Sequence, residues 1–208
     1  MLNKDLPGPF RNSKELILAS KSHRRQRLLA SLGLHFRVQP GKECETPPYT
    51  GQSPEDYCRK MARTKACSAY TGQGRGLILA ADTIVISGQQ ILGKPENSEL
   101  ALQTLRSLNG TTHEVLTGCC LLEQASGLKK IFVVSTLVTM ARHQDSILRA
   151  YVQTKEPLDK AGSYAIQGVG GFLVQSIQGS YTNVVGLPLN EVLQSLLDCQ
   201  AIQLEEIP

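Results

Sequence analysis

The chain has 208 residues, with 22 Lys and Arg against 18 Asp and Glu, and 41% of its residues are hydrophobic. This length and composition fit one globular domain or two small lobes, and they exclude a chain that is disordered throughout. The longest apolar runs, at residues 77–86 and 131–140, are too short to cross a bilayer, so no membrane association is expected.

The cysteines and the first residues indicate an intracellular protein. No charged and apolar leader opens the chain, and the six cysteines include no Cys-x-x-Cys pair. We therefore expect reduced thiols and a cytoplasmic location. The four histidines show no metal-ligand spacing, so structural zinc is not expected.

Positive charge is concentrated in residues 20–37, which contain no acidic residue. The basic residues of this segment are Lys21, Arg24, Arg25, Arg27 and Arg37. The apolar run at 16–19 predicts a buried strand, and the leucines that follow predict a helix capped by Ser20 or Ser22. Such a strand-to-helix turn favours bound phosphate. A compact polyphosphate suits it better than an extended duplex, so no stable nucleic-acid complex is expected.

The rest of the chain mixes strands and helices. Ser53-Pro54 predicts a helix that runs to about residue 70, after a loop at 41–53, and residues 77–86 predict a buried strand that turns back at Ser87-Gly88. Further helices are predicted over 96–108, 145–153 and 189–197, and further strands over 113–122, 130–141, around Tyr164 and over 172–177. Because strict βαβ alternation is missing, these elements predict an α/β protein with a mixed sheet. Residues 1–14 are predicted to be a loose N-terminal extension.

Asp82 is the most informative single residue, because its carboxylate interrupts an apolar strand. The pattern is compatible with a buried ion pair or strand-end hydrogen bond, and equally with a metal ligand or general base. Lys65, Lys94 and Gln167 would by themselves be ordinary surface or turn residues. The chain contains neither a P-loop motif nor a Gly-x-Ser-x-Gly elbow.

Six segments in order resemble the Maf family of nucleoside triphosphate pyrophosphatases, from about residue 16 to residue 197. They are Leu18-Ala19-Ser20-Lys21-Ser22-His23-Arg24-Arg25, Met61-Ala62-Arg63-Thr64-Lys65-Ala66, Ala81-Asp82-Thr83-Ile84-Val85, Gly93-Lys94-Pro95, Asp159-Lys160-Ala161-Gly162-Ser163-Tyr164-Ala165-Ile166-Gln167-Gly168 and Asn183-Val184-Val185-Gly186-Leu187-Pro188. His23 departs from the pattern, which usually has Pro there.

The resemblance implies a mixed α/β fold like that of the inosine triphosphatases, with two lobes around a central cleft. Residues 15–208 would form a single catalytic domain, and a homodimer is among the assemblies it implies. The implied activity is hydrolysis of the α–β phosphoanhydride of a nucleoside triphosphate, which gives the monophosphate and pyrophosphate with Mg²⁺ or Mn²⁺.

The resemblance also assigns roles to residues. Asp82 takes the place of the catalytic proton acceptor, and Glu45 that of a second acid, with the two sharing the metal; Glu43 is the alternative second acid. Ser20, Arg25, Lys65 and Lys94 match residues of the phosphate site, the two lysines as catalytic groups. Arg24, Thr83 and Gln167 stand where the subfamilies differ, and their combination is similar to members that act on dTTP and UTP.

Two other functions are compatible with the same residues. The basic segment could serve a nucleic-acid-binding module, although no aromatic residues accompany it in a stacking pattern. The chain could also be an interaction protein in cell-division control, a role that the family resemblance includes and that need not require catalysis.

Overall fold

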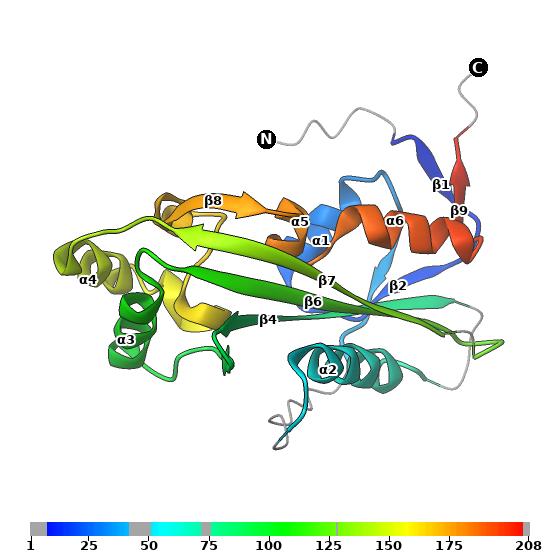
Figure 1. Ribbon diagram of the computed structural model, residues 1–208. Coiled ribbons are helices and arrows are strands. Elements are labelled where there is room, and N and C mark those ends of the chain that lie inside the picture. The colour runs from blue at the N-terminus through cyan, green and yellow to red at the C-terminus, as the bar shows by residue number, and fades with distance from the viewer. Residues whose placement is uncertain (1–7, 42–50, 72–75, 128, 206–208) are drawn as a thin grey trace. The chain divides into compact units, whose positions relative to one another are not determined.

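The structure, a computed structural model, describes residues 8–41, 51–71, 76–127 and 129–205. Contacts between residues divide the chain into two compact units. Unit 1 comprises Met1–Asp82, Gly118–Val133 and Gly186–Pro208, and unit 2 comprises Thr83–Thr117 and Val134–Val185. Three long strands run from one unit into the other: β4 (Leu77–Ser87), β6 (Thr112–Glu123) and β7 (Lys129–Met140) (Figure 1).

The main sheet is mixed, as the sequence predicts. Its hydrogen-bonded order is β3-β2-β4-β6-β7-β8, and β5 pairs with β4. In unit 1, β2 (Leu16–Leu18) is parallel to both β3 (Arg37–Val38) and β4. In unit 2, β5 (Gln90–Leu92) is antiparallel to β4, and β8 (Val174–Gln178) is antiparallel to β7.

Helices and short turns complete each unit. Unit 1 contains α1 (His23–Ala30), α2 (Pro54–Ser68), α6 (Leu189–Asp198) and the antiparallel pair β1 (Phe10–Asn12) and β9 (Ile202–Leu204). Unit 2 contains α3 (Ser98–Leu108), α4 (Asp145–Gln153), α5 (Tyr181–Val185) and the 3-10 turns η1 (Glu156–Asp159), η2 (Ala161–Ser163) and η3 (Val169–Leu173).

The strands of unit 1 separate two apolar clusters, because successive side chains point to opposite faces. Leu79 and Ala81 of β4 join the cluster that also contains side chains of α1 and α6. Ile78 and Ala80 join the other cluster, which contains alanines of α2. Figure 1 shows α2 and α6 on opposite sides of these strands. By the same alternation Asp82 belongs to the face that α2 covers.

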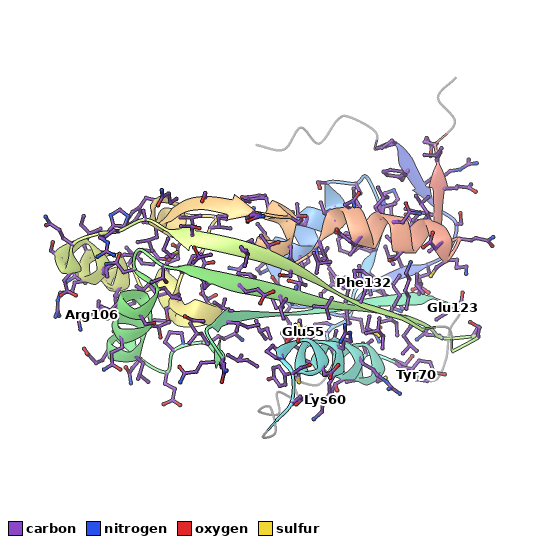
Figure 2. The ribbon with its side chains drawn as sticks, viewed as in Figure 1. Glu55, Lys60, Tyr70, Arg106, Glu123 and Phe132 are labelled. Carbon is purple, nitrogen blue, oxygen red and sulfur yellow. The ribbon has the colours of Figure 1, made fainter. Side chains whose placement is uncertain are left out.

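Lys60 illustrates the outward face of α2. Its side chain is exposed and projects from α2 on the side away from the strands (Figure 2).

The start of this helix follows the sequence prediction, because Ser53 Oγ accepts the Asp56 N–H at 3.1 Å and caps it.

Unit 2 has its own apolar cluster, formed mainly by α3, α4 and the adjacent strands. Arg106 on α3 (Figure 2) donates to both carboxylate oxygens of Asp145 on α4, at 2.6 and 2.9 Å. This two-point ion pair joins the two helices on their exposed side.

Two local predictions differ from the structure. Residues 10–12 are paired with β9 and are not a loose extension, because their backbone groups complete a two-stranded sheet. The strand predicted around Tyr164 is wrong: that residue lies between two 3-10 turns, and glycines with positive φ at 162 and 168 break the extended path. None of the helices in the described ranges is long and apolar enough to cross a membrane.

His113 gives unit 2 a pH-dependent stability. It is buried in β6, with Nε2 2.8 Å from the Tyr164 hydroxyl, and burial lowers its pKa to about 4. Between about pH 6.5 and pH 4 the unfolded chain therefore binds a proton here that the folded chain does not.

We expect the free energy of unfolding to fall as the pH falls through this window, with a contribution from His113 on the order of 3 kcal/mol. In urea unfolding at several pH values, His113→Gln should lose this part of the dependence, because glutamine does not titrate. His35→Gln, at an exposed histidine, is the control that should keep it. Equal pH slopes for His113→Gln and the unaltered chain would contradict the assignment.

Candidate active site

Asp82 forms an enclosed ion pair with α2. Its carboxylate Oδ1 lies 2.5 Å from Lys65 Nζ, and the two side chains are only 12% and 22% exposed. Removing two charges from water costs about as much as their attraction returns, so a pair this enclosed is weak evidence for a stabilising role. Of the two readings that the sequence allows, the structure shows the buried ion pair, and a catalytic role for the carboxylate stays a prediction.

Cys58 fixes the backbone beside that carboxylate. It lies seven residues before Lys65, which places both side chains on the same face of α2. The Cys58 thiol donates to the main-chain oxygen of Asp82 at 3.2 Å and accepts the Gly118 N–H at 2.9 Å. Burial, helped by the nearby Asp82 charge, raises the pKa of Cys58 to about 12, so the thiol keeps its proton and remains a donor.

Gly118 allows α2 to approach the strands. A Cβ atom at this position would lie 2.6 Å from the main-chain oxygen of Cys58, closer than any real Cβ contact. The missing side chain thus permits the approach at which Cys58 and Lys65 both reach Asp82.

Arg25 and Ser20 make a second polar group in unit 1. Arg25 donates from Nε to the Gly186 main-chain oxygen at 2.7 Å and from Nη1 to Ser20 Oγ at 3.4 Å. Ser20 Oγ also accepts the Ser22 N–H at 3.2 Å, at the start of α1. Burial lowers the pKa of Arg25, and the negative charge of Asp82 opposes this effect. Arg24, the residue before Arg25, is also half-buried.

Three other predicted residues, Thr83, Lys94 and Gln167, belong to unit 2. Thr83 Oγ1 lies 2.9 Å from Thr117 Oγ1, and Thr117 donates to the main-chain oxygen of Asn183 at 3.1 Å. Lys94 and Gln167 are exposed.

The loop before Lys94 is tied to the segment that leads to Gln167. The Gly93 oxygen accepts the Gly162 N–H at 3.2 Å, which joins two of the segments that carry the family resemblance.

The second acid of the predicted metal site, Glu45, and its alternative Glu43 lie outside the described residues. Within the described ranges no three His, Cys, Asp or Glu side chains gather into a metal site. Asp82 by itself supplies a hard oxygen donor of the kind that Mg²⁺ and Mn²⁺ prefer.

Comparison with known proteins decides the family. The model of the Maf-like protein family matches residues 15–199. The chain belongs to the Maf family. A dTTP/UTP pyrophosphatase of Nitratidesulfovibrio vulgaris is 45% identical to this Maf-like chain over 195 residues, which is 94% of the chain and 92% of the relative. A dTTP/UTP pyrophosphatase of Anaeromyxobacter dehalogenans strain 2CP-C is 49% identical over 178 residues, 85% of this chain and 89% of the relative.

One solved structure is a more distant match. The nucleoside-triphosphatase / dITP/XTP pyrophosphatase of Mycobacterium abscessus covers 90% of this Maf-like chain and 97% of its own, with 17% identity and a TM-score of 0.38. This likeness is too low to inform the site. The family resemblance and the mixed α/β architecture predicted from the sequence are confirmed, whereas the cleft between lobes stays a prediction.

The structure adds residues that the sequence did not single out. In unit 1 it brings predicted site residues together in two pairs, Lys65 with Asp82 and Ser20 with Arg25. Cys58 and Gly118 were missed, since a buried cysteine and a strand glycine have many ordinary explanations. The seven-residue spacing from Cys58 to Lys65 was the one available signal.

Gly118→Ala is expected to lower the free energy of unfolding by about 1–3 kcal/mol, because the added methyl group displaces α2 from the strands. The same displacement should reduce turnover, since it moves Lys65 and Cys58 away from Asp82. Urea unfolding and steady-state kinetics measure the two effects. Gly93→Ala is the control for stability, because a Cβ there meets open space; equal stability of the two variants would refute the packing argument.

Proposed function

We propose that this Maf-like chain is an acid anhydride hydrolase that cleaves dTTP and UTP to the nucleoside monophosphate and pyrophosphate. The observation that carries the proposal is the enclosed Lys65–Asp82 pair, found in a chain 45% and 49% identical to proteins named dTTP/UTP pyrophosphatase. The nucleic-acid-binding and cell-division alternatives have no comparable support.

Asp82 is the proposed proton acceptor. A water molecule attacks the α-phosphorus, the bond from that phosphorus to the bridging oxygen breaks, and pyrophosphate leaves with the electron pair. The proton that the water loses passes to the Asp82 carboxylate. The Cys58 thiol supports this role, because it holds the Asp82 backbone without itself ionising.

The cations around the acid counter the charge of the substrate. Arg25 and Lys65, which resemble phosphate-site residues, would stabilise the negative charge that develops on the departing pyrophosphate. Arg25 is held by Gly186 and Ser20, so its guanidinium needs little reorganisation when substrate binds. Lys94 would serve the same purpose from unit 2.

Base selection is assigned to Arg24, Thr83 and Gln167. Gln167 can both donate and accept a hydrogen bond, which suits the O4 and N3–H edge shared by thymine and uracil. Thr83 is oriented by its bond with Thr117. Together these residues support a preference for dTTP and UTP.

A divalent cation, Mg²⁺ or Mn²⁺, completes the proposal. Asp82 and Glu45 would hold it, because magnesium is commonly bound by one or two carboxylates together with substrate phosphates. When bound, it neutralises phosphate charge and polarises the oxygens of the anhydride.

We further propose that the protein works in the cytoplasm, possesses no stable nucleic-acid partner and forms a homodimer. Within the described ranges Cys67, Cys119 and Cys199 are free thiols, which suits a reducing compartment. The homodimer rests on the family resemblance.

The first experiment is a measurement of pyrophosphate release across common and modified nucleoside triphosphates. We expect release with Mg²⁺ or Mn²⁺, none with EDTA, and kcat/KM for dTTP and UTP at least about tenfold above those for CTP and purine nucleotides. Activity centred on a purine would keep the reaction and refute the base assignment. No release from any substrate would refute the proposed function.

Asp82→Asn should lower kcat by about 10²–10⁴-fold with little change in KM, because asparagine cannot take the proton while the phosphate-binding cations remain. Asp56→Asn makes the same change at an exposed acid of α2 and should leave kcat unaltered. Near-normal turnover by a folded Asp82→Asn variant would remove Asp82 from the mechanism.

A further inference from the structure

The loop that carries Gln167 has a conformation that only glycine adopts readily. Gly168, the next residue, has φ +103° and ψ −154°. Gln167 itself is exposed, so its amide does not owe its position to burial. Its orientation must come from contacts on either side of it in the loop.

Glu156 supplies the contacts that follow Gln167. It opens the turn η1, and its carboxylate accepts two consecutive main-chain N–H groups, with Oε1 3.1 Å from Val169 N and Oε2 2.8 Å from Gly170 N. Each oxygen thus has its own donor. Hydrogen bonds to a charged acceptor are about twice as strong as neutral ones, so this two-point contact fixes the loop firmly.

Tyr151 supplies the contact that precedes Gln167. The side chain, which is 2% exposed, accepts the Ala165 N–H on its hydroxyl oxygen at 3.3 Å. Burial, together with the neighbouring Glu156 carboxylate, raises the pKa of Tyr151, so the hydroxyl keeps its proton. The main chain two residues before Gln167 is therefore held by Tyr151, and the main chain two and three residues after it is held by Glu156.

The glycines of the loop have no room for larger residues. A Cβ at Gly168 would lie 2.2 Å from Glu156 Oε1, and a Cβ at Gly170 would lie 2.3 Å from the Tyr151 hydroxyl oxygen. The loop thus closes directly over the carboxylate and the hydroxyl. Because the fit is this close, Glu156 and Tyr151 support the loop as part of the packed structure and do not merely touch its surface.

We propose that Glu156, supported by Tyr151, is a positioning residue for base recognition: it holds the Gln167 loop so that the amide meets the pyrimidine edge in one orientation. The inference rests on the proposed function, in which Gln167 reads the base. An exposed glutamine samples many rotamers, and discrimination between bases requires its donor and acceptor to be fixed in advance. Glu156 touches no substrate in this proposal and acts only through the loop.

The test compares substrates that differ at the edge Gln167 is assigned to read. UTP presents a carbonyl and an N–H where CTP presents an amino group and a bare nitrogen, so the ratio of their kcat/KM values reports base recognition. Inhibition by tripolyphosphate, which has no base, reports phosphate binding alone. Thermal unfolding establishes that each variant is folded.

For Glu156→Ala we expect the UTP-to-CTP ratio to fall about tenfold while inhibition by tripolyphosphate is unchanged. Tyr151→Phe keeps the ring and removes only the hydroxyl, so it should also lower the UTP-to-CTP ratio. If Glu156→Ala does not fold, the Tyr151→Phe variant tests the proposal in its place. Glu99→Ala, which removes an exposed acid from α3 of the same unit, should leave the ratio unchanged.

A double variant tests whether Glu156 acts through Gln167. Glu156→Ala combined with Gln167→Ala should be no less selective than Gln167→Ala alone, because the two changes remove the same recognition. Additive losses, an unchanged ratio in Glu156→Ala, or an equal loss of tripolyphosphate inhibition would overturn the inference.

The same measurements separate this inference from the proposed function. If Gln167→Ala leaves the ratio unchanged, Gln167 does not read the base and both statements are wrong. If Gln167→Ala lowers the ratio and the Glu156 and Tyr151 variants do not, only the positioning role is wrong.

Discussion

The burial of one carboxylate is the constraint on which unit 1 depends. Asp82 stands in a strand whose other side chains fill two apolar clusters, and a charge placed there needs a partner. Lys65 reaches it because the residues between α2 and the strands are small: Ala62, Ala66 and Ala80 belong to that interface, and Gly118 has no side chain at all. Tight packing is therefore a condition for the ion pair.

The same packing lets two residues of α2 hold Asp82 at two different places, its carboxylate and its main chain. Lys65 contacts the carboxylate of Asp82, whereas Cys58, two helical turns earlier, holds its main chain. A thiol suits the main-chain contact because burial keeps it protonated, so it adds no charge beside the acid. The electrostatics at Asp82 are thus left to the lysine and to Arg25.

In unit 2 two of the candidate side chains are exposed, and buried or half-buried polar groups support the loop that carries one of them. Lys94 and Gln167 are the exposed residues, and the order of the Gln167 loop comes from the Glu156 carboxylate and the Tyr151 hydroxyl. Positive φ angles at the loop glycines allow the chain to wrap around these groups. The contacts that hold Asp82 and the contacts that hold the Gln167 loop therefore share no side chain.

The sequence by itself determined the elements with strong local signals and the identity of the family. The Ser53-Pro54 helix start, the apolar strand around Asp82 and the six family segments depend on neighbouring residues, and the structure and the comparisons agree with them. Tertiary structure decided the pairing of Phe10–Asn12 with Ile202–Leu204, the turns around Tyr164, the partners of Asp82 and the contacts that support the Gln167 loop. Such contacts join residues far apart in the chain, so their energies depend on packing that no local pattern records. The roles of Cys58, Gly118 and Glu156 could therefore not be predicted from the sequence, because they depend on that packing.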